Sequence, residues 1–600
     1  MSNYQISLPV VVLTAVATTT LILACTPSQH TDQISNTTPS VKIETKLKPA
    51  ENEQDVGVRT GAVDTFITQE MARKEHAMKL SPSLSLSEDA ALPASTVYGS
   101  AAPLQHLRAP SEPVNRENYA HFDDNSIKLV AEAPVSTFSI DVDTGSYSNV
   151  RRMLNNGQLP VEDAVRVEEL VNYFSYDYPV PKSSNEPFAV TTEVGVTPWN
   201  QNTHIMHIGI KGYDISRDSL PTSNLVFLVD VSGSMKSDDK LGLLKSALKL
   251  LSKQMRSKDR ISIVVYAGAS GVVLEPVAGN ETAKISQALD ALTAGGRTNG
   301  AAGIRTAYQL AEQSFIKDGI NRVIIATDGD FNVGTVNFEA LKDLIEEKRK
   351  SGISLTTLGF GTGNYNDHLM EQLADAGNGN YAYIDTLNEA QKVLVDEMSS
   401  TLNTIARDVK IQVEFNPAVV AEYRLIGYEN RALNREDFNN DKIDAGDIGA
   451  GHTVTALYEI SLVNSNSKYI DPLRYTKASS SKQQHQDEIA LLRLRYKQPA
   501  SNTSKLIERP IQTAEIEPNL DKTSERFRFS ASVAGFGQLL RGGKYTNNYQ
   551  YADVLELARN ARGNDAFGYR GEFISMVNLA KTLETTHAEN QAGIASQTAL

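Results

Sequence analysis

Three small oxygen-bearing side chains directly follow an apolar run in the middle of the chain. Residues 225–229 predict a buried strand, and Asp230, Ser232 and Ser234 come after it in a D-x-S-x-S pattern. This alternation turns one carboxylate and two hydroxyls to the same side, in the loop at the carboxyl end of the strand. Hard cations such as Mg²⁺ take oxygen ligands of this kind at short distance and keep some of their waters. The motif therefore predicts a divalent cation site.

Two further oxygen ligands stand where a doubly wound sheet would place them. Thr298 lies in the loop 295–300 before a predicted helix, and Asp328 closes the apolar run 323–327. The loops at the carboxyl ends of parallel strands meet in the usual ligand crevice of an open α/β sheet. We therefore expect Thr298 and Asp328 to join the first three ligands.

This constellation resembles the metal-ion-dependent adhesion site of von Willebrand factor type A (VWA) domains, at all five positions: Asp230, Ser232, Ser234, Thr298 and Asp328. The resemblance implies a Mg²⁺ or Mn²⁺ ion held directly or through water by the first aspartate and the two hydroxyls. It also implies that the threonine and the second aspartate complete the shell. A protein partner's Asp or Glu carboxylate would supply the last ligand. The alternative is a Ser/Gly-rich turn after a strand.

Composition excludes several classes of function. The 600 residues are enough for two to four domains. The net charge of −14 disfavours nucleic-acid binding, because binding to phosphates needs a positive field. Residues 537–544 superficially resemble a phosphate-binding loop, but Gly543 displaces the lysine and Tyr545 replaces the Ser/Thr. We therefore expect neither a nucleic-acid nor a nucleotide partner.

The single cysteine, Cys25, ends the stretch Ile-Leu-Ala-Cys after a mostly apolar segment at residues 8–23. That segment is short for a membrane span but suits a signal peptide. The pattern resembles a bacterial lipobox and implies a signal peptide over residues 1–24, lipidation of Cys25 and membrane anchoring. Thr26 resembles the signal for outer-membrane sorting, so a periplasmic or surface-facing body is expected. The alternative is an uncleaved hydrophobic anchor, which would also place the body outside the cytoplasm.

Residues 25–125 are expected to form a disordered tether. The segment is rich in Ser, Thr, Pro, Glu and Gln and poor in aromatic residues, so it cannot bury enough apolar surface to offset the cost of ordering. It would hold the folded body away from the membrane.

The rest of the chain divides by its hydrophobic periodicity. Residues 126–222 form an N-terminal segment with strands, and residues 223–404 alternate strand and helix, which predicts a mostly parallel, doubly wound α/β domain. Residues 405–600 form a β-rich domain with terminal helices. Because strands lie on both sides of the α/β domain, we expect it to be inserted into a β-sandwich. The strands predicted in the last domain are 409–415, 423–428, 453–462, 488–496 and 525–532.

Two other stretches contain candidate cation ligands. Residues 141–146 superficially resemble a cation loop, but an Asx-type turn at a strand end is favoured because no distal ligand can be assigned. A calcium site is a second possibility at Asp437, Asn439, Asp441, Asp444 and Asp447. Lys442 and Ile448 stand where an EF-hand needs its glycine and its bidentate glutamate, so a solvated acidic turn is favoured.

The chain from residue 134 to 583 resembles a family of uncharacterised bacterial VWA lipoproteins with a C-terminal domain of unknown function. The residues that carry this resemblance are 138–147, 166–174 and 449–459. The family implies an architecture rather than a reaction. We therefore expect a lipid-anchored module that binds a protein partner through Mg²⁺, and not an enzyme. The alternatives are a structural or assembly protein of the envelope in which the metal only stabilises the fold, and, less favoured, a metal-dependent hydrolase. Neither a nucleophile elbow nor an H-E-x-x-H motif is present in the sequence.

Overall fold

A six-stranded sheet forms the centre of the α/β domain in the computed structural model, which describes residues 116–182, 186–296, 298–329, 338–471, 485–499 and 501–598. The strand order is β10-β9-β8-β5-β6-β7, and all neighbours are parallel except β6 and β7. The strands are β5 (Ser223–Asp230), β6 (Arg260–Tyr266), β7 (Ser270–Ala278), β8 (Ile320–Thr327), β9 (Ile353–Phe360) and β10 (Tyr381–Ile384).

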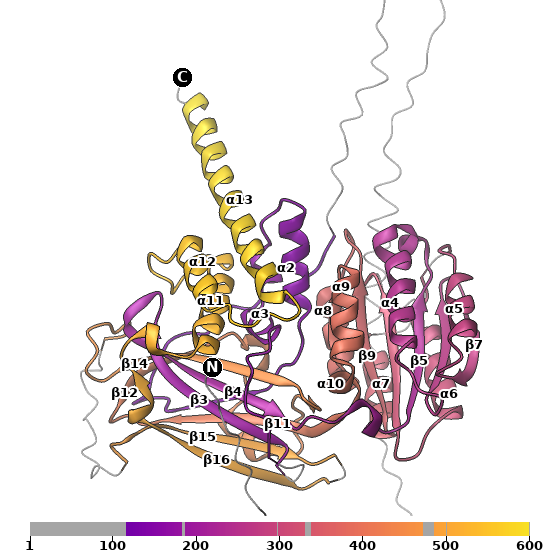
Figure 1. Ribbon diagram of the computed structural model, residues 1–600, viewed down its shortest axis with the longest axis horizontal. Coiled ribbons are helices and arrows are strands. Elements are labelled where there is room, and N and C mark those ends of the chain that lie inside the picture. The colour runs from indigo at the N-terminus through magenta and orange to yellow at the C-terminus, as the bar shows by residue number, and fades with distance from the viewer. Residues whose placement is uncertain are drawn as a thin grey trace, which may run out of the picture. The chain divides into compact units, whose positions relative to one another are not determined.

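Helices cover both faces of this sheet (Figure 1). Side chains alternate along a strand, so Leu225, Phe227 and Val229 of β5 face one helical layer while Val226 and Leu228 face the other. The first layer contains α4 (Leu243–Ser252), α5 (Thr282–Asp290), α9 (Leu387–Gln391) and α10 (Met398–Leu402). The second contains α6 (Gly300–Gln313), α7 (Phe338–Lys350) and α8 (Asp367–Ala376). Burial on both faces explains why the sequence of β5 is continuously apolar.

Two sheets, antiparallel except for the parallel pair β3 and β17, form a β-sandwich from segments on both sides of the α/β domain. The first has the order β1-β12-β14-β4-β3-β17 and the second β13-β11-β15-β16, with β2 paired to β11. The strands that precede the α/β domain are β1 (Lys128–Leu129), β2 (Val135–Ser139), β3 (Phe188–Thr197) and β4 (Asn200–Gly212). Those that follow it are β11 (Thr404–Phe415), β12 (Val420–Ile426), β13 (Ile448–Gly449), β14 (Thr453–Leu462), β15 (Glu488–Lys497), β16 (Ser504–Gln512) and β17 (Ile516–Glu517).

The pairings of β4 with β14 and of β2 with β11 join strands from opposite sides of the α/β domain. The expectation of an α/β domain inserted into a β-sandwich is therefore confirmed.

A layer of helices packs on the outer face of the first sandwich sheet. It contains α2 (Gly145–Asn155), α3 (Val167–Asn172), α11 (Glu525–Leu540), α12 (Tyr551–Asn560) and α13 (Tyr569–Thr598). Their apolar side chains share a core with Ile205, Ile426 and Leu457, whereas Val454 and Tyr458 of β14 face the core between the two sheets. Strand β14 is therefore buried on both faces, and its buried Glu459 is paired with Arg424 at 2.9 Å.

The prediction of a strand at residues 525–532 is wrong, because this segment begins helix α11. The alternation of Arg526, Phe527, Arg528 and Phe529 imitates a strand over four residues. Ser524 caps the helix, its Oγ accepting from the backbone N of Phe527 at 3.2 Å. The helix is buried nearly all round, so it shows no amphipathic stripe from which a helix could be predicted.

The predicted tether is too long at its C-terminal end. Residues 116–125 belong to the folded body, where Glu117 forms an ion pair with Arg152 at 2.8 Å and Asp124 one with Arg541 at 2.8 Å. The rest of the tether, the predicted signal peptide and Cys25 lie outside the described residues. Within the described residues, none of the helices combines the length and the apolar composition that crossing a membrane requires.

Candidate metal centre

Asp230 stands at the carboxyl end of β5, between the parallel strands β6 and β8. Its Oδ1 accepts from the backbone N of Ser232 at 2.8 Å, and its Oδ2 accepts from the Tyr266 hydroxyl at 3.0 Å and the Thr327 Oγ1 at 2.9 Å. Burial raises the pKa of Asp230 to about 6, although its hydrogen bonds to Ser232 and Thr327 favour the charged form. The carboxylate is therefore held in one orientation at the edge of the sheet.

The hydroxyls of Ser232 and Ser234 lie 2.9 Å apart. This is an ordinary separation for a hydrogen bond between hydroxyls. It is also the separation of neighbouring ligands around an octahedral ion with bonds of Mg²⁺ length, roughly 2.8–3.0 Å, whereas Ca²⁺ bond lengths would give about 3.3–3.7 Å. The pair of serines therefore fits a small octahedral cation.

The loop that carries Thr298 is bonded to the D-x-S-x-S loop by two backbone contacts. The N–H of Gly295 donates to the carbonyl of Val231 at 2.8 Å, and that of Gly233 donates to the carbonyl of Gly296 at 3.1 Å. Gly296 adopts a φ of +87°, which favours glycine. These contacts bring the loop of Thr298, which ends at the start of α6, to the same edge of the sheet as Asp230.

Asp328 follows β8 and is fully buried. Its Oδ2 accepts from the Lys240 ammonium at 2.9 Å and from Asn364 Nδ2 at 3.3 Å, and Lys240 also donates to Asn364 Oδ1 at 3.0 Å. Neither Lys240 nor Asn364 was predicted as part of the site. Asn364 follows β9, so the rule for carboxyl ends of parallel strands indicates its place, whereas no motif marks Lys240.

The loop that carries Asn364 is paired with residues 116–119, which we call the N-terminal strap. The backbone N of Arg116 donates to the carbonyl of Gly363 at 2.9 Å, and that of Asn118 donates to the carbonyl of Tyr365 at 2.9 Å. Asn118 forms a parallel bridge with Asn366. The first described residues of the chain therefore lie beside the metal-site loops.

The predicted ligands thus stand on loops that meet at one end of the sheet. The ligand atom that each residue offers is a carboxylate or hydroxyl oxygen. Such a set suits Mg²⁺ or Mn²⁺ rather than a soft metal. The charge of Asp328 raises the pKa of Asp230, so the two carboxylates lie close enough to interact. A divalent ion would relieve this repulsion and could accept an oxygen ligand from outside.

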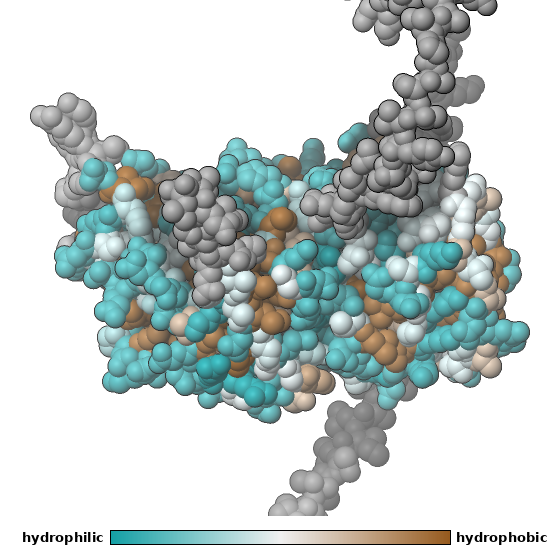
Figure 2. Space-filling model, turned by 90° about the horizontal axis from the view of Figure 1, so that it is seen from above, coloured by the Kyte–Doolittle hydropathy of each residue, from teal (hydrophilic) through white to brown (hydrophobic). Residues whose placement is uncertain are grey.

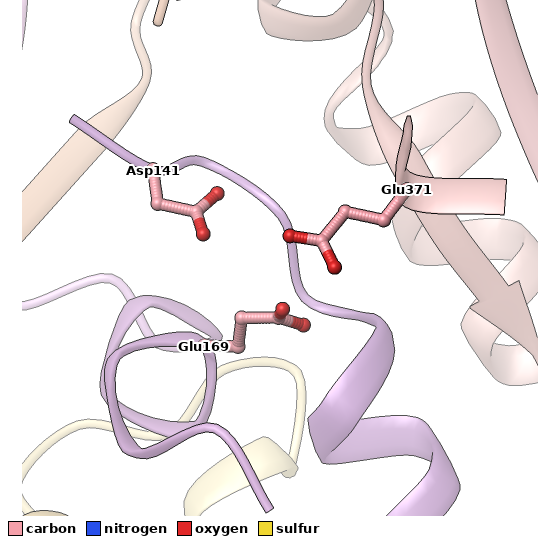
Figure 3. A group of neighbouring side chains, drawn as sticks. All are labelled: Asp141, Glu169 and Glu371. Carbon is pink, nitrogen blue, oxygen red and sulfur yellow. The ribbon is translucent and has the colours of Figure 1, made fainter. Parts of the chain in front are cut away.

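A second group of carboxylates lies away from this centre. Asp141, Glu169 and Glu371 are all buried, and their oxygens lie within 4.8 Å of one another (Figure 3). Arg431 Nε lies 3.2 Å from Asp141 Oδ2, and Arg431 Nη2 lies 3.2 Å from Glu371 Oε1. Arg166 forms an ion pair with Glu169. We call these five residues the acidic joint, because they connect β2, α3, α8 and the turn after β12.

The acidic joint is an ion-paired contact between the α/β domain and its neighbours. Arg166 Nη1 also bonds to Asp367 Oδ2 at 2.7 Å at the start of α8. Burial raises the pKa of Glu169, while the guanidinium of Arg166 lowers it and favours the charged carboxylate. The backbone N of Asp143 donates to Asp141 Oδ1 at 2.9 Å, so the Asx-type turn predicted at residues 141–146 is confirmed.

The acidic stretch at residues 437–447 is neither a gathered calcium site nor simply a solvated turn. Its side chains point to different partners: Asp437 caps a turn at Asn434, Asn439 and Asp441 contact Arg495, Asp444 contacts Arg349, and Asp447 contacts Asn378. The last two contacts reach the α/β domain. The stretch is therefore part of the contact between the two domains.

Comparison with known proteins assigns these regions. Residues 224–397 match the family described as von Willebrand factor type A domain, and residues 113–207 match one described as von Willebrand factor. Residues 400–583 match the family described as "Uncharacterized protein YfbK, C-terminal". The chain is therefore a VWA protein with an additional C-terminal domain.

The uncharacterized protein YfbK of Escherichia coli K12 is 50% identical over 469 residues, which cover 77% of this chain and 80% of that relative. The chain belongs to the YfbK family. Human inter-alpha-trypsin inhibitor heavy chain H3 is 24% identical over 255 residues, 40% of this chain and 28% of that protein.

Two solved structures match parts of this chain at low sequence identity. The von Willebrand factor type A protein from Catenulispora acidiphila is 13% identical and covers 65% of this chain and 89% of that one, with a TM-score of 0.37. The ArnB paralog VWA2 from Sulfolobus acidocaldarius is 15% identical and covers 66% of this chain and 98% of that one, with a TM-score of 0.33.

Proposed function

We propose that this chain is a cell-envelope lipoprotein whose VWA domain binds a protein partner through a Mg²⁺ or Mn²⁺ ion. The ion would be held by Asp230, Ser232, Ser234, Thr298 and Asp328. VWA domains typically serve in protein interaction and commonly bind a divalent metal. The observation that carries the proposal is the meeting of two buried carboxylates with a pair of hydroxyls 2.9 Å apart at the carboxyl edge of the sheet.

A partner carboxylate would supply the remaining ligand. Such a ligand is charge-assisted and directional, so a small contact can fix the orientation of the partner. On the face of the molecule shown in Figure 2, hydrophilic residues predominate and hydrophobic residues form small separate groups. This surface supports recognition by polar and metal contacts over docking on a broad apolar patch.

Anchoring rests on the lipobox-like sequence that ends at Cys25. We propose that Cys25 carries lipid and that the folded body faces the periplasm or the cell surface, with the outer membrane as the anchoring membrane. Mass spectrometry of the purified chain would test this: a first residue of lipid-modified Cys25 supports it, and an unmodified Cys25 contradicts it.

The loops that carry Asp230, Thr298, Asp328 and Asn364, which we call the metal loops, have surroundings that support binding over hydrolysis. Asp230 contacts Tyr266 and Thr327, and Asp328 contacts Lys240 and Asn364. A metal-bound water needs a general base within hydrogen-bond reach to become a nucleophile. Among these described contacts, Lys240 is held as an ion-paired donor, and no histidine takes the place of a base.

One observation favours the second candidate, a structural or assembly role. Buried Arg151 of α2 lies 2.8 Å from Glu389 of α9 and 2.8 Å from Glu572 of α13, and it also pairs with Asp385. This ion-pair hub fastens the end of the VWA domain to the helical layer. A metal in such a domain could serve to stabilise the assembly, with partners bound elsewhere on the chain.

The deciding experiment compares metal and partner binding by the purified chain, Asp230→Ala and Asp343→Ala. Asp343 is an exposed residue of α7 and provides a matched loss of one carboxylate away from the site. Calorimetry would measure Mg²⁺ and Mn²⁺ affinity, and capture from an envelope extract would be run with Mg²⁺ and with EDTA.

The proposal expects metal binding and metal-dependent capture of the same protein by the wild type and Asp343→Ala, with both lost in Asp230→Ala. Metal binding without any metal-dependent capture would favour the structural role. Absence of metal binding by the folded wild type would overturn the metal site itself.

A further inference from the structure

Lys240 places a buried ammonium within the metal loops. It lies in the short π-helix η5 (Asp238–Gly242), six residues after Ser234, and its side chain is 8% exposed. Its Nζ donates to Asp328 Oδ2 at 2.9 Å and to Asn364 Oδ1 at 3.0 Å. A long cationic side chain beside a cation site needs an explanation, because its charge opposes the ion that the other residues would attract.

The position of Lys240 is enforced by its surroundings. The loop after β9 passes over the methylene stem of Lys240, and a side chain at Gly361 would collide with that stem. Gly361 has a φ of +76°, so glycine is favoured there on conformational grounds also. The N-terminal strap holds the next part of this loop through Gly363 and Tyr365. Lys240 is therefore held in place and cannot turn away to solvent without moving the loop.

The fixed charges of the site follow from this arrangement. Asp230 and Asp328 are both fully buried, and Lys240 is a buried cation that contacts Asp328. The neighbouring Lys236, Asp238 and Asp239 are exposed, so water and salt screen their charges more strongly. Among the described residues buried at this site, two carboxylates and one ammonium leave one negative charge. A divalent ion then gives the loaded site one net positive charge, whereas without the ammonium the loaded site would be neutral.

We propose that Lys240 is a specificity-determining residue that makes the loaded site select an anionic ligand. The inference rests on the proposed metal-dependent binding function. One buried charge has two opposite effects: it weakens the affinity of the site for the metal ion alone, and it strengthens the affinity of the metal-loaded site for a carboxylate. The site is thereby suited to bind metal and an acidic group together rather than metal by itself.

The test uses Mn²⁺ as the metal and acetate as the anionic probe, with neutral acetamide as its isostere. Calorimetry gives the Kd for Mn²⁺, and water-proton relaxation of the Mn²⁺-loaded protein follows displacement of bound water by acetate. Lys240→Gln removes the charge while keeping N–H donors for Asp328 and Asn364, and Lys240→Arg keeps the charge. Circular dichroism and melting curves verify that each variant is folded.

We expect Lys240→Gln to bind Mn²⁺ roughly tenfold more tightly and the loaded variant to bind acetate several-fold more weakly, since a unit charge near a divalent ion contributes on this order at a site open to water. Lys240→Arg should keep both values near those of the wild type. A variant that weakens Mn²⁺ and acetate binding together, or changes neither, would show a merely structural role and overturn the inference.

The wild type alone provides a measurement that does not depend on the folding of a variant. The loaded wild type should bind acetate in clear preference to acetamide, and equal binding of the two would overturn the inference while leaving the metal site intact. Failure of the folded wild type to bind Mn²⁺ would overturn the proposed function and this inference together.

Discussion

The metal loops and the acidic joint both gather buried carboxylates, but they differ in what faces the oxygens. In the metal loops, Asp230 accepts from the backbone N of Ser232, the hydroxyls of Ser232 and Ser234 pair with each other, and Asp328 accepts from one ammonium. In the acidic joint, Asp141, Glu169 and Glu371 meet two guanidinium groups. A guanidinium presents its donors in a planar fork that matches a carboxylate and leaves little for a metal. The kind of neighbour therefore distinguishes an ion-paired contact from a cation site better than the number of acids does.

The two regions also differ in what they connect. The metal loops lie at one edge of the VWA sheet, where an ion would remain open to an outside ligand. The acidic joint lies among elements of the VWA domain, the β-sandwich and the helical layer, so its charges are satisfied within the chain. Removing one member should therefore affect stability in the joint and ligand binding at the metal loops.

The largest effect is expected for Arg166→Met in the acidic joint. The substitution leaves Glu169 and Asp367 buried without their main cation, and breaking a buried pair in this way costs about 3–5 kcal/mol. Urea unfolding would measure the loss of unfolding free energy. Arg435→Met, at an exposed arginine, is the control and should change stability little. A loss as small as that of the control would show that the joint is not an energetic unit.

The second-largest effect is expected for Asp230→Ala, and this effect on stability should appear only when metal is present. A ligand at one hundred times its Kd adds about 2.7 kcal/mol to the stability of a protein that binds it only when folded. We expect the wild type to gain stability of this order in Mg²⁺ and the variant to gain none, as followed by thermal unfolding with and without EDTA. An equal gain in both proteins would place the metal elsewhere.

The pH dependence of metal binding should be smaller but distinctive. The metal-free pKa of Asp230 is raised by burial to about 6, so a proton competes with the ion below that pH. The apparent metal affinity should fall up to roughly tenfold per pH unit below about pH 6 and be nearly constant above about pH 7. Calorimetry between pH 5 and 8 would measure it, and a flat profile would contradict the assignment of Asp230 as a ligand.

Without metal, the contribution of Asp230 to folding stability should change with pH in the opposite direction to the metal affinity. The folded state keeps a proton on Asp230 that an unfolded aspartate, with an ordinary pKa of 3.8, has already released. The contribution of Asp230 to stability is therefore greatest below about pH 4 and declines as the pH rises to about 6. Added Mg²⁺ should offset this decline, and it should do so only where Asp230 is intact.

The smallest effect is expected for Asp444→Ala, which removes the ion pair with Arg349 between the β-rich domain and the VWA domain. The Asp444 side chain is 56% exposed, and pairs of this kind contribute about 0–1 kcal/mol. Urea unfolding in low and high salt would measure the difference. A loss near that of Arg166→Met would mean that exposed contacts, rather than the acidic joint, hold the two domains together.

Much of the architecture could be predicted because local patterns and global packing agree. The continuous apolar run of β5 followed by Asp230 indicates a buried parallel strand that ends in a carboxylate, and that is how the chain folds. Strands on both sides of the VWA domain indicated its insertion. Helix α11 could not be predicted in the same way, since a helix buried nearly all round lacks a polar face.

Other features depend on contacts that are distant in sequence. Lys240 reaches Asp328 across 88 residues, and no spacing rule reports such a pair. Strands β7 and β16 were not expected, because both are edge strands with exposed positions and weak alternation. Residues 116–125 have the composition of a tether, yet Glu117 and Asp124 are held by arginines of the folded body. Ion pairs with residues distant in sequence therefore place residues 116–125 in the folded body, which their composition alone does not indicate.

The N-terminal strap also has a mechanical consequence. The described chain begins at Arg116, beside the loop that contains Asn364, and Asn118 pairs in parallel with Asn366 in that loop. Tension applied at Arg116 would load these hydrogen bonds in shear and reach the loop that contacts Lys240 and Asp328. The strap therefore couples a mechanical load at this end of the folded body to the loops of the candidate metal site.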